Sequence, residues 1–208
     1  ATILSQDLLD SAEPLRDTDP TTYGQIMINH GILRVAARDY QLGLSIVERG
    51  LEFLEARSHA FNDVLINGVM AKGICQLQLG LLTEAEDTFR RAQHITHRQK
   101  GVYNKEQLPM ISYLTATNLR QRNSPAADQQ QRFSLRVAVQ SYGPDSTEIL
   151  PTLARLGSYF STRGSSIPLM AIPQLRMERD LLFKDAVRMY LRAIEIIESN
   201  YGVNDLRL

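Results

Sequence analysis

Residues 73–92 read GICQLQLGLLTEAEDTFRRA, and this stretch decides the fold. It places small residues at four positions, which are Gly73, Gly80, Ala85 and Ala92. The bulky Phe89 lies between the last two of them. Two antiparallel helices can approach closely only where one offers a small side chain for the other to pack into. The stretch therefore predicts a helical hairpin whose two helices cross closely.

The same pattern recurs on both sides of this stretch with a period of 42 residues. One series of small residues consists of Gly31, Gly73, Thr115 and Gly157. Four more series keep the step, and in the last three of these the fourth member comes after an insertion: Arg38, Gly80, Arg122 and Gly164; Gly43, Ala85, Ala127 and Ala186; Val47, Phe89, Gln131 and Tyr190; Gly50, Ala92, Ser134 and Ala193. One such hairpin cannot bury its apolar faces alone, so repeated hairpins stack on their neighbours. The sequence therefore predicts an all-α solenoid of antiparallel helix pairs.

Helix ends are also marked in the sequence. Three glycines come after long helical patterns, as glycines after helix C-termini do: Gly101, Gly143 and Gly202. Thr83 with Glu86 and Asp145 with Glu148 have the spacing of capping boxes. Asp19 and Ser124 each precede a proline, which predicts a helix N-cap followed by proline at the first helical position.

These signals predict a single repeat array over residues 1–208. The predicted helix pairs are 20–37 with 39–57, 61–79 with 83–99, 105–122 with 125–141, and 146–163 with 180–200. The predicted repeats are 18–59, 60–101, 102–143 and 144–202, with an insertion at 165–182 in the last one. Residues 1–17 are interpreted as the second helix of a partial repeat, and residues 203–208 as the start of a further one.

Residues 73–92 resemble the tetratricopeptide repeat in their small, glycine, alanine, aromatic and alanine positions, as do Gly157, Gly164, Ala186, Tyr190 and Ala193. The runs that begin at Tyr142-Gly143 and Tyr201-Gly202 resemble the inter-repeat turn of the long, 42-residue variety, found in kinesin light chains and many bacterial proteins. The resemblance implies a right-handed superhelical solenoid. It also implies a role in binding proteins, without indicating which.

In such solenoids the first helix of each repeat lines a concave groove. At about 100° per residue, the side chains opposite the packing face are expected to point into it. The predicted groove residues of the first two repeats are Gln25, Ile28, Asn29, Ile32, Asn67, Met70, Ile74 and Leu77. Those of the last two are Ser112, Tyr113, Arg120, Arg155, Ser158 and Thr162.

Two hypotheses fit this groove. In one, an amphipathic helix or apolar peptide binds the aliphatic first half, with its acidic end toward Arg120 and Arg155. In the other, the chain itself covers the aliphatic residues. The insertion is a second candidate site because prolines bracket an apolar run, which contains Ile167, Leu169, Met170 and Ile172. This run could enter the groove, dock a neighbouring chain, cover the end of the array, or pack on its own repeat.

Composition and motifs exclude other classes. The 23 basic and 23 acidic residues balance, which argues against a nucleic-acid binder. No apolar run is long enough to span a bilayer, so direct membrane insertion is not expected. His94 and His97 have a metal-compatible spacing but no evident third ligand, so neither metal nor cofactor is expected. Cys75 is interpreted as a buried structural thiol, and no catalytic constellation is present.

The sequence thus predicts a non-catalytic scaffold module of a larger protein, which binds another protein or peptide through its groove. Two alternatives stay open: a ligand-sensing regulatory domain of a signalling or transcription protein, and a self-association module that forms a homo-oligomer. A cytoplasmic location is favoured, because the first residues show no signal peptide; a signal peptide preceding this fragment would make the location periplasmic.

Overall fold

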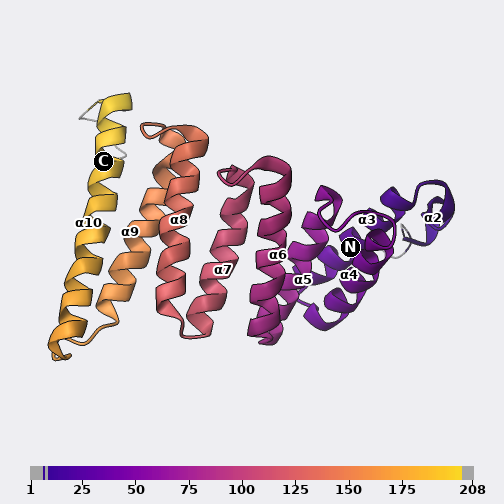
Figure 1. Cartoon of the computed structure of the whole chain (residues 1–208), viewed down its shortest axis with the longest axis horizontal. Coiled ribbons are helices and arrows are strands. Elements are labelled where there is room, and N and C mark those ends of the chain that lie inside the picture. Colours follow the sequence, from indigo (N-terminus) through magenta and orange to yellow (C-terminus); the bar gives the residue numbers. More distant parts are fainter. Residues whose placement is uncertain (1–6, 8, 203–208) are drawn as a thin grey trace. The chain divides into compact units, whose positions relative to one another are not determined.

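The computed structural model of the chain describes residue 7 and residues 9–202, and every regular element in this part is a helix (Figure 1). The longer helices are α3 (Pro20–Ala36), α4 (Tyr40–Glu55), α5 (Ile66–Leu79), α6 (Leu82–Lys100), α7 (Leu108–Arg120), α8 (Ser124–Tyr142), α9 (Leu150–Ser165) and α10 (Pro173–Tyr201). Short elements are α2 (Leu15–Thr18) and three 3₁₀ turns, η1 (Asp63–Leu65), η2 (Lys105–Gln107) and η3 (Thr147–Ile149).

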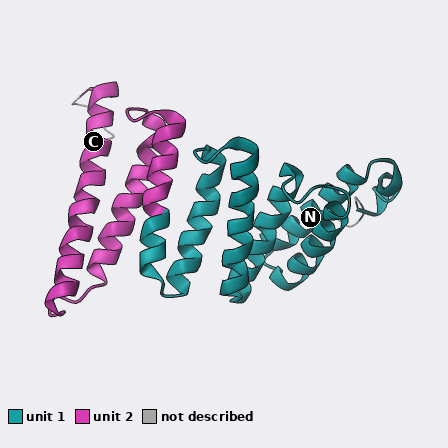
Figure 2. Cartoon of the chain, viewed as in Figure 1, with its two compact units in different colours: residues 1–130 teal, residues 131–208 magenta. Residues whose placement is uncertain are grey.

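The chain divides into two compact units, which are coloured in Figure 2: unit 1, residues 1–130, and unit 2, residues 131–208. Within unit 1, α3 packs against α4, α4 against α5, α5 against α6, and α6 against α7. Within unit 2, α9 packs along α10. Helix α8 crosses the division. The predicted all-α fold of sequential antiparallel helix pairs is confirmed.

The glycines that recur in the predicted repeat, Gly31, Gly73 and Gly157, lie at helix crossings. A Cβ on Gly31 would lie 2.5 Å from Val47, one on Gly73 would lie 2.6 Å from Phe89, and one on Gly157 would lie 2.7 Å from Tyr190. In each case a small residue of the first helix faces the bulky residue of the second. The two series therefore form one recurring contact, which explains why they share a period.

The 3₁₀ turns before α5, α7 and α9 begin 42 residues apart, and the sequence reasoning missed them. A side chain caps each turn: Asn62 accepts a hydrogen bond from the backbone N–H of Val64, Asn104 from that of Glu106, and Ser146 from that of Glu148. Each turn ends with a buried residue, which is Leu65, Gln107 or Ile149. The turn therefore anchors the first helix of a pair by one inward side chain.

The predicted caps are only partly correct. Asp19 caps α3, since its carboxylate accepts the backbone N–H of Thr22 at 3.1 Å. The capping box at Thr83 is wrong, because α6 begins at Leu82 and Glu86 instead pairs with Arg90 at 2.6 Å. Asn123, one residue before Ser124, supplies the cap of α8 by accepting from the backbone N–H of Ala126 at 3.3 Å.

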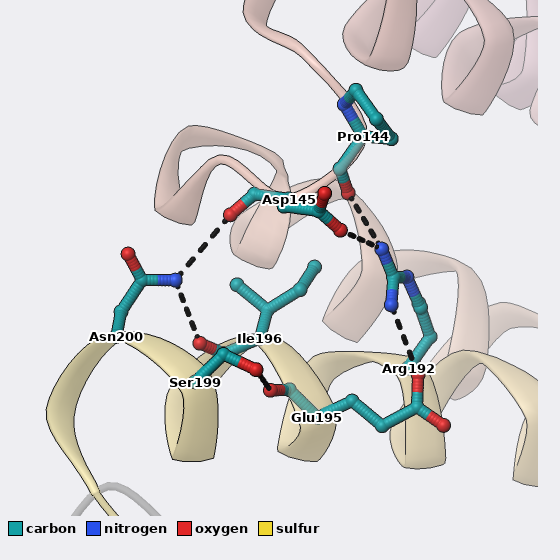
Figure 3. A network of polar contacts seen from close by, with 7 residues as sticks. All are labelled: Pro144, Asp145, Arg192, Glu195, Ile196, Ser199 and Asn200. Atoms are coloured by element: carbon teal, nitrogen blue, oxygen red, sulfur yellow. Dashed lines mark hydrogen bonds and ion pairs between the residues drawn. The ribbon is translucent and has the colours of Figure 1, made fainter.

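The capping box at Asp145 is also wrong, because Ser146 is the cap and the Asp145 carboxylate pairs with Arg192 of α10 (Figure 3). Arg192 also donates to the carbonyl of Pro144 at 3.1 Å and pairs with Glu195 at 3.0 Å. Asn200 donates to the carbonyl of Asp145 at 3.4 Å. In unit 2 this network ties the entry turn of the first helix to the last turns of the second.

The insertion predicted at 165–182, between the two helices of the last pair, is largely helical. Helix α9 continues to Ser165 and α10 begins at Pro173, so only residues 166–172 are non-helical. Pro173 occupies the first position of α10, where its missing N–H costs no hydrogen bond and its fixed φ suits a helix. The second helix is therefore longer at its start than the predicted 180–200.

The prediction for residues 1–17 is only partly covered, since residues 1–6 and 8 lie outside the described part. Residues 9–11 are helical, residues 12–14 form a turn, and α2 comes next, so the predicted helix does not continue to residue 15. The predicted start of a further repeat at 203–208 lies outside the described residues.

Candidate peptide-binding surface

Exposed amide side chains line the surface of the first helices in unit 1. Gln25 and Asn29 lie one turn apart on α3, and Asn67 lies in the first turn of α5. With Asn62 and Asp63 of the turn before α5, they border two adjoining hollows of about 400 and 210 Å³. The hollows are further lined by Thr21, Ile28 and Val64. Amides both donate and accept hydrogen bonds, so this surface has the chemistry to pair with a peptide backbone.

Two aliphatic residues predicted for the groove are instead part of the core. Ile28 is 2 % exposed and Leu77 is 4 % exposed. Ile28 packs against Gly50 of α4 and Gly68 of α5, and Leu77 packs with Phe89 and Leu114. The neighbouring helices cover most of both side chains. The prediction that they are open groove residues is therefore corrected: Leu77 belongs to the core, and Ile28 contributes only to the wall of the smaller hollow.

The other aliphatic groove candidates of unit 1 are partly buried. Ile32 and Met70 pack against one core cluster, and Met70 and Ile74 pack against the next. The accessible chemistry of α3 and α5 is therefore more polar than the sequence suggested.

The candidates on α7 are engaged within unit 1. Ser112 donates to the carbonyl of Leu108 at 2.9 Å, and the ring of Tyr113 stacks on Phe89 with centroids 5.1 Å apart. Arg120 donates to the carbonyl of Leu77 near the C-terminus of α5, where a cation complements the helix dipole. Arg120 therefore has a structural contact besides any ligand role.

In unit 2, Arg155, Ser158 and Thr162 succeed each other at three- and four-residue steps on α9, and all are exposed. Partial desolvation lowers the pKa of Arg155, although a guanidinium stays charged at neutral pH. Within the described residues Arg155 has no ion pair or hydrogen bond. It is thus a cation that an acidic ligand group could reach.

The four insertion residues do not act as one group. Ile167 packs against the core cluster of Leu156, Phe160, Leu182 and Ala186. Leu169, Met170 and Ile172 are exposed, Met170 almost completely. The insertion therefore packs on its own helix pair by one residue and presents an apolar tip.

The histidine and cysteine candidates have structural surroundings. His97 contacts the side-chain oxygen of the buried Gln107 at 2.5 Å, and His94 lies against Phe61 with ring centroids 5.2 Å apart. Cys75 is fully buried, and desolvation raises the pKa of its thiol to about 11. In the part of the chain that is described, no three His, Cys, Asp or Glu side chains gather as metal ligands. None of the described helices is long and apolar enough to cross a bilayer.

Sequence reasoning missed Asn62 and Asp63 as parts of the candidate surface. Both belong to the 3₁₀ turn region before α5, which breaks the helical periodicity used to assign facing residues. The recurrence of Asn62, Asn104 and Ser146 at the 42-residue period was the signal that could have revealed the turn.

These helix pairs, with small residues at their crossings, have the fold of a tetratricopeptide-type repeat protein. The chain is similar in structure to BtubC (BKLC) from P. vanneervenii, with a TM-score of 0.61 over 98 % of this chain and 92 % of that one. The two sequences are 15 % identical, so the similarity establishes the fold alone. No protein-family model and no curated protein sequence matches this chain.

Proposed function

We propose that this chain is a non-catalytic module that binds an extended peptide segment of another protein on the amide-lined surface of α3 and α5. The supporting observation is the group of Gln25, Asn29 and Asn67, which are exposed and border the same hollow of about 210 Å³. Helical repeats present such surfaces to protein partners in general.

The amides favour main-chain recognition because each carries both a donor and an acceptor, as a peptide group does. Bidentate pairing with successive peptide groups would hold a peptide without requiring one particular side chain. The carboxylate of Asp63 at the edge of the hollows adds a negative charge. A peptide with a basic residue near one end therefore fits this surface better than an acidic peptide.

The acidic-end hypothesis is retained only for unit 2, where Arg155 is exposed beside Ser158 and Thr162. A peptide with an acidic group fits that part of the first-helix surface. The two candidate surfaces offer opposite charges, since Asp63 borders the one in unit 1 and Arg155 lies on the one in unit 2. Each site can be tested by its own substitution.

The test is selection of peptides from a random displayed library on the whole chain, followed by fluorescence polarisation with the selected peptides. Substitution of Asn29→Ala with Asn67→Ala is expected to weaken binding about tenfold or more, since each lost hydrogen bond costs about 1 kcal/mol. Gln41→Ala is the matched control, because it removes an exposed amide at the start of the second helix α4. Equal binding by the double variant and the control would show that the peptide uses another surface.

A further inference from the structure

Helix α10 presents an apolar face that the rest of the described chain covers only in part. The face consists of Phe183, Val187, Tyr190, Leu191, Ile194 and Tyr201, each between 37 % and 55 % exposed. At about 100° per residue these side chains fall within roughly 100° of the helix circumference. Along one edge, Phe183 and Tyr190 lie against Gly164 and Gly157 of α9. A continuous apolar stripe of this kind, still open to water, marks an interaction surface.

The equivalent face of α4 shows what such a stripe does when a further helix lies on it. Val47 occupies the repeat position of Tyr190, and Leu51 that of Ile194. Val47 is 0 % exposed and Leu51 is 3 % exposed, whereas Tyr190 and Ile194 are 41 % and 37 % exposed. Helix α5 packs on α4, and a Cβ on its Gly68 would lie 2.8 Å from Leu51. The α10 face thus has the side-chain pattern of a surface that accepts a packed helix.

The charges beside the stripe indicate which helix would pack there. Lys184 and Arg188 flank the N-terminal half of the stripe, and Glu195 flanks the C-terminal half on the same side. Glu198 lies within the C-terminal half of the stripe, toward the same side. When two identical helices pack antiparallel about a two-fold axis, the same flank of each faces the other, reversed in direction. Basic residues of one copy then face acidic residues of the other. In a parallel two-fold pair the charged flank of one helix would face the opposite flank of the other, so these charges would not meet.

One register satisfies both the charges and the apolar residues. With the two-fold axis near Leu191, Lys184 lies opposite Glu198 and Arg188 opposite Glu195 of the second copy. The same register places Phe183 opposite Tyr201, and Tyr190 opposite Ile194. Within the described residues Lys184 and Glu198 form no ion pair, and Arg188, paired with Asp185 at 3.1 Å, keeps a side chain that is 71 % exposed. These three charged groups are therefore accessible to a second copy. The fourth, Glu195, pairs with Arg192 of its own helix at 3.0 Å and keeps a side chain that is 61 % exposed.

We propose that the exposed face of α10 binds α10 of a second copy of this chain, antiparallel, and makes the protein a homodimer. The stripe lies on α10, the second helix of its pair, whereas the proposed peptide-binding surface lies on the first helices α3 and α5. The dimer proposal therefore does not depend on the peptide-binding function. Isologous pairing needs only one surface and closes after two copies.

Sedimentation equilibrium of the whole chain over a concentration series tests the proposal, and a dimer is the expected result. Leu191→Glu places two like charges at the two-fold axis and is expected to raise the dimer Kd on the order of 100-fold. Leu181→Glu is the matched control: Leu181 lies on the same helix, is 60 % exposed against 54 % for Leu191, and lies outside the stripe. Val187→Lys is a second stripe variant in case Leu191→Glu fails to fold, which circular dichroism detects.

A charge exchange tests the antiparallel register. Lys184→Glu and Glu198→Lys alone are each expected to weaken the dimer about three- to tenfold, and the double variant to restore it, because the exchanged charges again face each other. A monomer at every concentration would overturn the proposal. So would equal effects of Leu191→Glu and Leu181→Glu, or a double variant weaker than both single ones.

Discussion

Arg38, Gly80 and Arg122 occupy the same repeat position in three successive helix pairs, one or two residues after the first helix of each pair. All three have a positive φ, at 63°, 84° and 60°. This left-handed conformation costs a residue with a Cβ roughly 1–2 kcal/mol, and glycine adopts it without that cost. The turn geometry therefore recurs, and only the middle repeat has the residue best suited to it.

Arg38→Gly is accordingly expected to raise the free energy of unfolding by roughly 0.5–1 kcal/mol, and Gly80→Ala to lower it by about 1 kcal/mol. A Cβ on Gly80 meets no atom within 4 Å, so the loss there arises from backbone strain alone. Urea denaturation followed by circular dichroism measures both changes. Effects of the same sign at the two positions would contradict a shared backbone requirement.

Cys75 gives a pH-dependent contribution to stability. Desolvation and the carboxylate of Glu48 raise the pKa of its thiol from 9.0 to about 11 in the folded protein. The unfolded chain therefore releases this proton at a lower pH than the folded chain. The contribution is complete below about pH 9 and is lost as the pH rises toward 11, at no more than about 1.4 kcal/mol per pH unit.

The measurement is the free energy of unfolding of the natural chain and of Cys75→Ala at several pH values between 8 and 11. Other groups titrate in both proteins, so the expected signal is the free energy of unfolding of the natural chain minus that of the variant. This difference should fall as the pH rises from 9 toward 11. Two parallel curves would show that the thiol ionises equally in the folded and unfolded chains.

At the scale of the element, the crossing of α5 and α6 depends on the contact of Gly73 with Phe89. Gly73→Ala is expected to destabilise the protein by about 1–3 kcal/mol, since the new Cβ would lie 2.6 Å from the Phe89 ring. Phe89→Leu removes the ring and leaves a smaller side chain there. The double variant should lose less than the sum of the two single losses, with a coupling of about 1 kcal/mol. Additive losses in urea denaturation would show that the two residues do not share this contact.

Local periodicity predicted the helices well but could not predict what covers their faces. The spacing of Gly31, Gly73 and Gly157 indicated the crossings because a small residue in a helix has few other uses. The direction of Ile28 was inferred from helix geometry alone, whereas its burial depends on Gly50 and Gly68 of two other helices. A helical wheel predicts on which side of its helix a side chain lies, and only the tertiary structure shows which residues cover it.

The start of α10 shows the same limit for a single residue. Pro173 ends the apolar run of the insertion and lies between the predicted helices 146–163 and 180–200, yet proline is equally suited to the first turn of a helix. The choice between the two depends on whether the residues after the proline can pack as a helix. In this chain the added first turns contact α9 through the ion pair of Glu178 with Arg163 at 3.0 Å, and they continue into Leu182 and Ala186, which pack in the core cluster of unit 2. Periodicity of apolar residues could not indicate this extension, because its contact with α9 is polar.

At the scale of the whole molecule, each unit has its own buried clusters. Leu51 lies in a cluster of unit 1 with Leu65, Val69 and Ile95, and Leu153 lies in a cluster of unit 2 with Ala138, Ile149 and Ile196. In repeat proteins, stability is roughly a sum of terms from each repeat and its neighbours. A core substitution should therefore act most strongly on the helices that share its cluster.

Leu51→Ala is expected to cost about 2–5 kcal/mol locally, because it leaves a cavity against Gly68 in a fully packed cluster. Native-state hydrogen exchange should then show faster amide exchange in α3, α4 and α5 and little change in α9 and α10. Leu153→Ala provides the reciprocal control, with the faster exchange in α9 and α10. Equal acceleration in all helices by either substitution would mean that the two units unfold as one cooperative body, because only global opening lowers the protection of every amide by the same factor.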